Sequence, residues 1–489
     1  MSSHQASTDT VSLAASDRLL RGAGSGLAQQ LAQRLAARMR DRLLLPGARL
    51  PSVRQCAAQQ GVSPSTVVAA YDVLQAQGWI RGERGRGFFV RAREAATVVP
   101  TALPRTRMQA PINATALIRG MFQPLGEQAQ PGMGTLPIDW LETPLLGRAL
   151  RRVGQSDALR LASLRYGDPK GDAQLRRVLV SRLAAWGLAV DAEQVVTTSG
   201  ATHALDLIGR SLLRAGDSVL VDELGWSVDF ARLNAMGVRL LPVPRDAQGP
   251  RLEVMDELCR AHAPKLYISV SVLHNPTGVC LSPPRAHQVL RLAQQHGFWV
   301  VEDDTYSHIA PEQATRMAVL DGLQRVIYVS GFSKVLVPNW RVGFMAAPSA
   351  LIDALVDTKL LSALSSPGVL EHALAWVLEQ GEFRRHTQSL VQRLDEARQR
   401  SVQLALAHGC QLAAEPAGMF GWVDTGVDTE VLAQRMLDHE VLLAPGALFH
   451  ARHEPSTRMR IGFATTQDQA FWRLFARERD ALAARAGTP

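Results

Sequence analysis

The amino-acid sequence predicts a multidomain protein in which a small, basic, mainly helical module precedes a large α/β domain. At 489 residues the chain exceeds the roughly 100–200 residues of one ordinary domain. The excess positive charge is confined to residues 26–93, whose eleven arginines and three acidic residues account for the whole net charge of +8. Through the middle of the chain, strand-like apolar runs alternate with helical patterns, which is typical of a parallel sheet covered by helices.

The composition excludes several classes of protein. Hydrophobic residues make up 46% of the chain, which supplies enough apolar material for folded cores and excludes a mainly disordered protein. No run approaches the ~20 apolar residues of a membrane helix, and the first residues lack the order of a secretory signal. The four cysteines are scattered, without the paired spacing of a disulfide, redox or metal site. We therefore expect a cytoplasmic protein without a membrane partner or a bound metal.

Composition along the chain predicts four segments. Residues 1–24 are rich in Ser, Ala, Thr and Gly and predict a flexible tail. Residues 25–91 form the basic module. Residues 92–114 contain Ala, Thr and Pro without an apolar period, so they predict an extended linker. The α/β domain then occupies residues 115–489.

Within the basic module the periodicity predicts three helices and a hairpin. Apolar residues at i, i+4 spacing indicate an amphipathic helix over 27–44, and a second short helix fits 51–60. Ser63 is a good N-cap and Pro64 suits the first helical position, so a third helix is expected to begin there. Strand-like residues flank a glycine-rich turn over 79–90. Three helices followed by a hairpin predict a winged helix-turn-helix, and its concentrated positive charge favours a partner with a phosphate backbone.

The α/β domain is expected to contain a large subdomain over about 150–365 and a smaller α+β lobe over about 366–489. Strands of the large subdomain are predicted at Gln194–Thr198, Ser218–Asp222, Val238–Val243, Leu266–Val272, Phe298–Glu302, Arg325–Ser330 and Val342–Ala346. Two short strands are predicted in the lobe, at Phe420–Val423 and Arg458–Phe463.

The basic module resembles the GntR-type winged helix. The resemblance covers residues 27–90 and rests on three runs, Gly47–Arg54, Gly61–Val67 and Ala70–Trp79. It implies that the third helix enters the major groove of double-stranded DNA while the glycine-flexed wing reaches neighbouring phosphates or the minor groove. The implied DNA contacts are Arg49, Ser52, Arg54, Ser63, Ser65, Thr66, Arg84 and Arg86.

One departure and one alternative concern this module. Relatives usually carry arginine where Pro64 stands, so the contacts at the start of the third helix differ from the usual set. The alternative is a winged helix that contacts only protein, with the positive charge as a solvated surface.

Chemistry-bearing residues follow several of the predicted strands. Lys334 is one of only four lysines in the chain, which narrows the search for a Schiff-base amine. Asp303 and Tyr306 end one strand, and a carboxylate there can pair with a protonated pyridine nitrogen. Asn275 follows another strand at a sharp turn, and Gly200 leads into a helix whose free N–H groups suit a phosphate.

Together these segments resemble the fold-type I aminotransferases over roughly residues 115–480. The resemblance implies a pyridoxal 5′-phosphate cofactor in a Schiff base with Lys334. It further implies that Asp303 pairs with the pyridine nitrogen, that Asn275 and Tyr306 bind the ring oxygen, and that Trp226 stacks on the ring. The phosphate is then expected to be held by Ser333, Arg341 and the helix start at Gly200, Ala201 and Thr202.

Two further residues take roles from this resemblance. Tyr166 matches a tyrosine that reaches the phosphate from a neighbouring subunit, and Arg460 matches the arginine that clamps a ligand carboxylate. Two departures accompany them. Gly331 stands where relatives often have a phosphate-binding Ser or Thr, and Leu224 and Trp226 replace a more usual Pro and Tyr.

A GntR-type winged helix joined by a linker to an aminotransferase-like domain resembles the MocR family of transcriptional regulators. This resemblance implies a head-to-tail homodimer that binds an operator with paired half-sites. It also implies that an amino compound, or pyridoxal phosphate itself, is sensed at the aminotransferase-like site. Binding there would change DNA affinity by favouring one of two conformations.

Two alternatives stay open at this point. One is an active aminotransferase with an accessory DNA-binding module, because the residues for a half-reaction are retained. The other is a scaffold with a vestigial cofactor fold. The effector, the operator sequence and the sign of regulation are not encoded in any pattern of this sequence.

Overall fold

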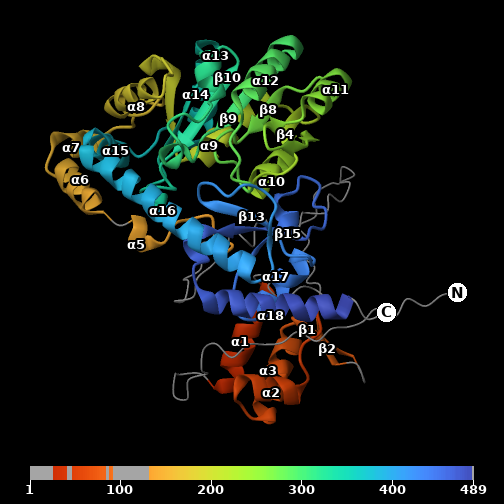
Figure 1. Cartoon of the computed structure of the whole chain (residues 1–489). Coiled ribbons are helices and arrows are strands. Elements are labelled where there is room, and N and C mark those ends of the chain that lie inside the picture. Colours follow the sequence, from red (N-terminus) through yellow and green to blue (C-terminus); the bar gives the residue numbers. More distant parts are fainter. Residues whose placement is uncertain are drawn as a thin grey trace, which may run out of the picture. The chain divides into compact units, whose positions relative to one another are not determined.

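The computed structural model describes residues 26–40, 44, 47–83, 87–91, 131–141 and 143–486. These residues belong to two compact units, a small N-terminal one and a large one that contains both main sheets (Figure 1). The predicted tail (1–24) and linker (92–114) lie outside the described residues. Within the described part of the chain, no helix is both long and apolar enough to cross a membrane.

The small unit has the predicted order of three helices and a hairpin. Its elements are α1 (Leu27–Arg40), α2 (Val53–Gln60), α3 (Pro64–Ala76), β1 (Ile80–Glu83) and β2 (Gly87–Val90). Ser63 caps α3 and Pro64 occupies its first turn, as the sequence predicts. Leu31, Leu35, Val67 and Leu74 are almost wholly buried in one apolar core. The amphipathic period of α1 therefore arises from packing on α3.

The large unit is organised around a seven-stranded sheet in the order β3-β11-β10-β9-β8-β4-β5. All its strands are parallel except β11, which runs antiparallel to both neighbours. The strands are β3 (Val195–Thr198), β4 (Ser218–Asp222), β5 (Arg239–Val243), β8 (Leu266–Ser269), β9 (Trp299–Asp303), β10 (Val326–Gly331) and β11 (Gly343–Ala346). The seven predicted strands are thus present, although β8 ends at Ser269 and not at Val272. A two-residue hairpin pair, β6 (Arg245–Asp246) and β7 (Gly249–Pro250), was not predicted.

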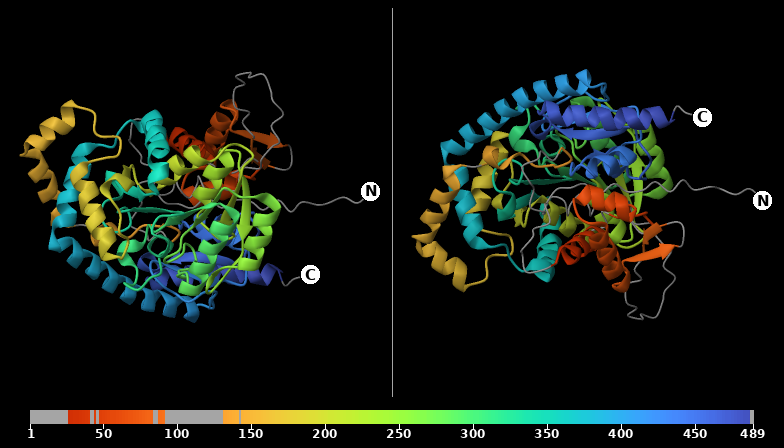
Figure 2. Two further views of the ribbon diagram at one scale, coloured as in Figure 1. Left: turned by 90° about the horizontal axis from the view of Figure 1, so that it is seen from above. Right: turned by 90° about the horizontal axis from the view of Figure 1, so that it is seen from below.

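Helices cover both faces of this sheet (Figure 2). Alternate strand residues enter two separate apolar clusters, with Val195 and Val300 in one, and Val196 and Val301 in the other. This alternation is the signature of a sheet that is buried on both sides. The helices of the large subdomain are α5 (Ile138–Leu141), α6 (Pro144–Gly154), α7 (Asp157–Leu164), α8 (Ala173–Ala185), α9 (Ala201–Leu212), α10 (Ser227–Ala235), α11 (Leu252–His262), α12 (Pro283–His296), α13 (Met317–Asp321) and α14 (Ser349–Ala363).

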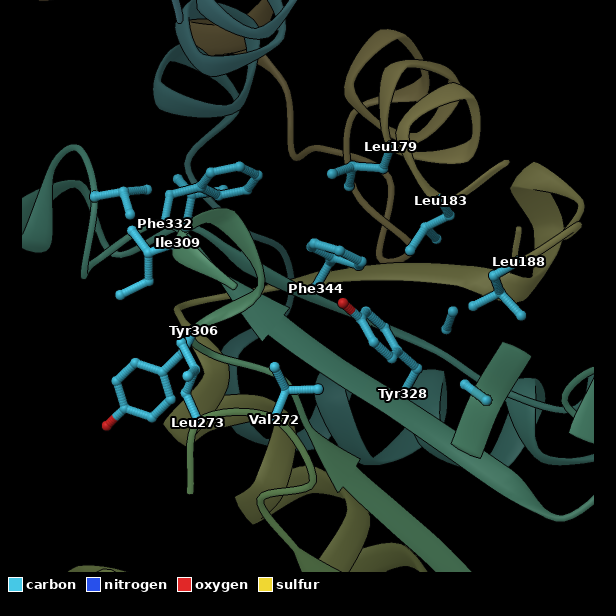
Figure 3. Packing of buried hydrophobic residues seen from close by; sticks show 14 of the residues in the cluster. Leu179, Leu183, Leu188, Val272, Leu273, Tyr306, Ile309, Tyr328, Phe332 and Phe344 are labelled. Carbon is cyan, nitrogen blue, oxygen red and sulfur yellow. The ribbon is translucent and has the colours of Figure 1, made fainter. Parts of the chain in front are cut away.

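The larger of the two clusters supports the strand ends that matter for function. Leu179 and Leu183 of α8 point towards Phe344 of β11 and Tyr328 of β10 (Figure 3). In the same view Tyr306 lies beside Leu273, on the loop that follows β8. Packing of this kind fixes the loops at the carboxyl edge of the sheet.

The smaller lobe contains a four-stranded sheet in the order β12-β13-β15-β14. Its predicted strands are β13 (Phe420–Asp424) and β15 (Arg458–Gly462), whereas β12 (Gln411–Leu412) and β14 (Ala444–Pro445) were not predicted. Strands of two residues carry too few side chains for a period to be recognised. The helices that follow the large sheet along the chain are α15 (Gly368–Glu379), α16 (Gly381–Ala407), α17 (Thr429–Leu437) and α18 (Gln469–Ala486), of which α15 packs on α6, α7 and α8 and not on the four-stranded sheet.

Candidate cofactor and ligand site

The candidate site lies at the carboxyl edge of the seven-stranded sheet. Asp303 is the last residue of β9, Lys334 follows β10, and Asn275 follows β8. Because β8, β9 and β10 are adjacent and parallel, residues that follow them meet at one edge. β3 ends at the same edge, since it is antiparallel to β11 and β11 is antiparallel to β10. These residues are far apart in the sequence, and the parallel pairing of the strands brings them together.

The Lys334 amine is partly buried and lies among charged groups. Its Nζ donates a hydrogen bond to Gly134 O over 2.6 Å. Burial lowers the pKa of Lys334 to about 8, an effect that Arg460 reinforces and Asp303 opposes. A lysine with this pKa has a substantial neutral fraction near neutral pH, and the neutral amine is the nucleophile that attacks a carbonyl.

Asp303 and Tyr306 are both buried at the end of β9. Burial raises the pKa of Asp303 to about 7, and the nearby Asp229 carboxylate on α10 contributes in the same direction. Against this, the Thr305 backbone N–H donates to Asp303 Oδ1 over 3.0 Å and its hydroxyl donates to the same oxygen. Burial also raises the pKa of Tyr306 well above its usual range, so the phenol keeps its proton and can donate it in a hydrogen bond. A carboxyl group poised in this way is suited to a partner that carries a proton, such as a pyridinium nitrogen.

Arg460 reaches the site from β15 and is fully buried. Its Nη1 donates to Asn275 Oδ1 over 2.9 Å, and its Nη2 donates to Gly132 O over 2.8 Å. The guanidinium carbon lies 4.3 Å from the centre of the Phe420 ring and 5.5 Å from that of Trp226. Burial lowers the pKa of Arg460 to about 10.

The Nε atom of Arg460 is buried and finds no hydrogen-bond acceptor among the described residues. An unpaired buried donor on a cation costs free energy unless an acceptor completes it. The arrangement therefore fits an anionic ligand group, and a carboxylate has the geometry that a guanidinium edge prefers.

A second anion-binding arrangement lies where β3 leads into α9. Arg341 Nη2 donates to Ser199 O over 3.0 Å, and Arg341 Nη1 donates to Ser333 Oγ over 3.2 Å. Gly200 has φ +85°, and a Cβ there would lie 2.5 Å from Arg341 Nη2, so only glycine allows this approach. The N-terminus of α9 then offers Ala201 and Thr202 beside an exposed arginine and a hydroxyl, a combination suited to a phosphate.

Gly331 and His203 are neighbours of this second arrangement. A Cβ on Gly331 would meet Ala201 N at 3.6 Å, which is ordinary contact, so the missing Ser or Thr has room. His203 Nδ1 accepts the Ser199 N–H over 3.1 Å and thereby shapes the turn. His203 is thus a structural residue, and no pattern in the sequence assigns it to the site.

Trp226 lies at the edge of the site beside Arg460, whereas Tyr166 lies on the surface of the chain. Trp226 is half-buried at the start of α10, near Arg460 and 6.2 Å from the Phe449 ring centre. Tyr166 has 86% of its surface exposed, so it points away from this chain's own interior. An exposed Tyr166 is compatible with its predicted reach into a neighbouring subunit.

Pattern reasoning missed several residues of the site. Gly132 and Gly134 bind Arg460 and Lys334 through their carbonyl oxygens, and Asp229 acts on Asp303. Asp229 lies in the first turn of α10, three residues after Trp226, and this spacing could have indicated that Asp229 lies near the site. Backbone carbonyls leave no comparable signal, because any residue can supply one.

The predicted DNA-contact residues of the small unit form a second candidate surface. Ser63 Oγ lies 2.8 Å from both Ser65 Oγ and Thr66 Oγ1, so the three hydroxyls form one exposed cluster at the start of α3. Ser52 caps α2 and bonds Gln55 Oε1 over 2.9 Å, so its hydroxyl already serves the helix. Hydroxyl clusters at a helix start suit phosphate and base edges.

Arginines of this second surface lie around the hairpin and α2. Arg54 is exposed on α2, and Arg49 Nε lies 3.2 Å from the position of a Cβ on Gly87, at the start of β2. Arg84 and Arg86 stand between β1 and β2 in the sequence and lie outside the described residues.

Two family models match the chain. Residues 152–477 match the aminotransferase class I and II family, and residues 27–90 match the bacterial regulatory proteins of the gntR family. The class that fold and site define is thus an aminotransferase-like domain preceded by a DNA-binding module. Domains of the first family typically bind pyridoxal phosphate, and the helix-turn-helix of the second implies DNA binding.

Two similar proteins are transcriptional regulators by name, and one solved structure is similar in fold. The uncharacterized HTH-type transcriptional regulator YisV of Bacillus subtilis is 26% identical, over 88% of this chain and 92% of that protein. The probable rhizopine catabolism regulatory protein MocR of Rhizobium meliloti is 27% identical, over 85% of this chain and 83% of that protein. The solved structure of LysN, the α-aminoadipate aminotransferase of Thermus thermophilus, is similar in fold, with a TM-score of 0.69, 24% identity and coverage of 76% of this chain and 95% of that one. The chain belongs to the aminotransferase class I and II family and, with its GntR module, is a MocR-type transcriptional regulator.

Proposed function

We propose that this MocR-type protein regulates transcription by binding DNA through the small unit and a pyridoxal phosphate-linked ligand through the large one. The observation that carries the proposal is the convergence of Lys334, Asp303, Asn275 and Arg460 at one sheet edge. An amine of lowered pKa, a carboxylate and an arginine with an unpaired donor match the three reactive parts of such a ligand: carbonyl, pyridine nitrogen and carboxylate.

Each part of the cofactor has a proposed holder in the chain. Lys334 would attach it, Asp303 would hold the proton of the pyridine nitrogen, and Asn275 and Tyr306 would bind the ring oxygen. Arg341, Ser333 and the α9 start at Gly200 to Thr202 would bind the phosphate, with Trp226 against the ring. When bound, pyridoxal phosphate supplies an electron sink and an imine-forming carbonyl. In a regulator these features serve recognition of an amino compound.

A homodimer is part of the proposal. Tyr166 is 86% exposed and Leu361 is 92% exposed. The loop that carries Tyr166 lies beside the loop after α14, because a Cβ on Gly167 would meet Ser365 Oγ at 3.5 Å. Exposed apolar side chains gathered in this way favour an interface between copies, and a two-fold dimer would present two winged helices to paired half-sites.

The test measures DNA affinity and cofactor attachment on the same preparation. Genomic fragments selected by the full-length dimer serve as DNA, and fluorescence anisotropy gives Kd with and without pyridoxal phosphate and a panel of amino acids. We expect the visible absorption of lysine-bound pyridoxal, and a change of Kd of roughly 5–150-fold, the range of ordinary allosteric coupling. A colourless protein whose Kd is indifferent to every ligand overturns the proposal.

An active aminotransferase is the second candidate. The observation that favours it is the joint retention of Lys334, Asp303 and Arg460, which regulation through binding does not strictly require. An assay with amino donors and keto acids separates the two. Repeated turnover near the ~10 per second median of enzymes supports the enzyme, whereas at most one slow half-reaction supports the regulator.

A further inference from the structure

A short segment before α5 lies against both cations of the site. This segment, Pro131–Thr135, is called the strap below. Pro131, Gly132, Met133 and Gly134 are all buried, although they lie outside the helices and strands of the described residues. Gly132 N donates to Leu442 O over 2.7 Å, and a Cβ on Gly132 would lie 2.6 Å from Leu443 C. The strap is therefore packed tightly on the chain that leads into β14.

The strap bonds the ligand-binding cations through two backbone carbonyls. Gly132 O accepts from Arg460 Nη2 over 2.8 Å, and Gly134 O accepts from Lys334 Nζ over 2.6 Å. A Cβ on Gly462 would lie 3.5 Å from the carbonyl oxygens of Pro131 and Met133, so β15 also contacts the strap. The strap thus bridges the smaller lobe and the lysine of the large subdomain.

Ligand groups and strap carbonyls compete for the same donors. Both bidentate edges of a guanidinium contain an Nη atom, and the edge formed by Nε and Nη2 includes the donor that Gly132 O already uses. A carboxylate on that edge brings an oxygen next to Gly132 O, and two acceptor oxygens repel. Condensation of Lys334 Nζ with an aldehyde forms one C=N bond and releases one water. At most one N–H then remains on Nζ, so Gly134 O loses most of its donor supply.

We propose that the strap reports the occupancy of the site to the DNA-binding module. A ligand with both a carbonyl-derived group and a carboxylate takes Lys334 and Arg460 from the strap and loosens it. In the sequence the strap stands between the winged helix and the rest of the large unit, so its displacement is passed along the chain towards the winged helix. This inference rests on the proposed function and adds the element through which the site acts.

Hydrogen exchange by mass spectrometry tests the strap directly in the full-length protein. The probes are pyridoxal 5′-phosphate, which can bond Lys334, and N-(5′-phosphopyridoxyl)-L-leucine, which brings a carboxylate. We expect exchange in the peptide that covers 131–137 to rise about fivefold or more with at least one probe, because the Gly132 N–H loses its protection. Unchanged exchange with both probes, in a protein that demonstrably binds them, overturns the strap proposal.

Glycine variants test the coupling. Gly132→Ala forces the strap away from Leu443, whereas Gly154→Ala at the end of α6 meets nothing within 4 Å and serves as the matched control. Gly134→Ala is a milder variant, because its Cβ meets Arg460 and Lys334 only at 3.6–3.7 Å. It guards against a Gly132 variant that does not fold. The readout is the ratio of DNA Kd values with and without the probe.

The expected ratios separate the two proposals. The wild type and Gly154→Ala should keep a ratio of about fivefold or more, while Gly132→Ala should move it towards one. Gly134→Ala adds a methyl group at ordinary contact distance from Arg460 and Lys334, so it should move the ratio in the same direction by a smaller factor. Wild-type ratios in both strap variants overturn the strap as the coupling element and leave the proposed function standing. A wild type that does not bind pyridoxal phosphate overturns the proposed function itself, and it is recognised by its absorption spectrum before any variant is made.

Discussion

Two lysines of the large unit share the same local chemistry and differ in their surroundings. Lys334 donates to Gly134 O over 2.6 Å and Lys359 donates to Thr197 O over 2.8 Å. Burial lowers the pKa of each amine to about 8. By hydrogen bond and pKa alone, either could be an activated amine.

Their neighbours distinguish them. Lys334 is partly buried beside Arg460, Asp303 and Arg341, which come from three different parts of the chain. Lys359 has no exposed surface. The charged groups that raise its pKa, Glu371 and Asp168, are carboxylates, which compensate its charge. A lowered pKa therefore marks a reactive lysine only where a ligand can reach the amine and where partners for the rest of that ligand surround it.

The largest expected difference between the two lysines concerns cofactor attachment. Lys334→Ala should abolish the visible absorption of bound pyridoxal completely, because the attaching amine is lost. Lys359→Ala should keep it in whatever fraction of the protein is folded. Borohydride reduction followed by peptide mass spectrometry checks the site of attachment. A phosphopyridoxyl group on Lys359 would contradict the assignment of Lys334 as the attaching amine.

The second difference concerns stability. Lys359→Met should lower the free energy of unfolding by about 2–4 kcal/mol, because it removes the buried amine that donates to Thr197 O and the positive charge that acts on the buried Glu371. Glu371 already has one carboxylate oxygen, Oε1, that finds no partner among the described residues. Adding Glu371→Gln to Lys359→Met should recover part of the loss, and denaturant unfolding of the single and double variants measures it. Strictly additive losses would show that the two side chains do not interact.

The third expected difference concerns the pH dependence of attachment. The reactive form of Lys334 is the neutral amine, whose fraction rises as pH approaches its pKa of about 8. The rate of pyridoxal phosphate attachment should therefore increase up to about tenfold per unit below pH 8 and level off above it. Stopped-flow absorption from about pH 6 to about pH 9.5, a range that brackets this pKa, measures the profile. A rate that still climbs about tenfold per unit above about pH 9 would indicate a lysine of ordinary pKa.

The smallest expected effect concerns the phosphate side of the Lys334 site. Gly331→Ser should tighten pyridoxal phosphate binding about fivefold, because a hydroxyl beside Ala201 N adds one hydrogen bond worth about 1 kcal/mol. The space exists, since a Cβ there makes only contacts of 3.6 Å. Gly331→Ala is the control without a hydroxyl, and equilibrium dialysis gives both Kd values. Equal affinities of the Ser and Ala variants would mean that the hydroxyl does not reach the phosphate.

The fold was largely predictable because burial leaves a recognisable pattern of apolar residues in the sequence. Runs such as Ser218–Asp222 and Val326–Gly331 are buried along their whole length, so they are mainly apolar. The N-terminus of α3 was predictable for a different reason: Ser63 and Pro64 act through their own backbone neighbours. Strands β12 and β14 were not predictable, because two residues contain no period.

The sequence is sufficient to predict which residues suited to cofactor binding follow the strands of the large sheet, namely Asp303, Lys334, Asn275 and the Gly200 turn. The contacts between these and other distant residues follow from the tertiary structure. It brought Arg460 to Asn275 across 185 positions of the chain, placed Asp229 beside Asp303, and buried Lys359 completely. It also set the carbonyls of Gly132 and Gly134 on the two cations. The physical reason is that side-chain identity is a local property, whereas a hydrogen bond or a shifted pKa depends on which distant atoms the packed chain brings within a few ångströms.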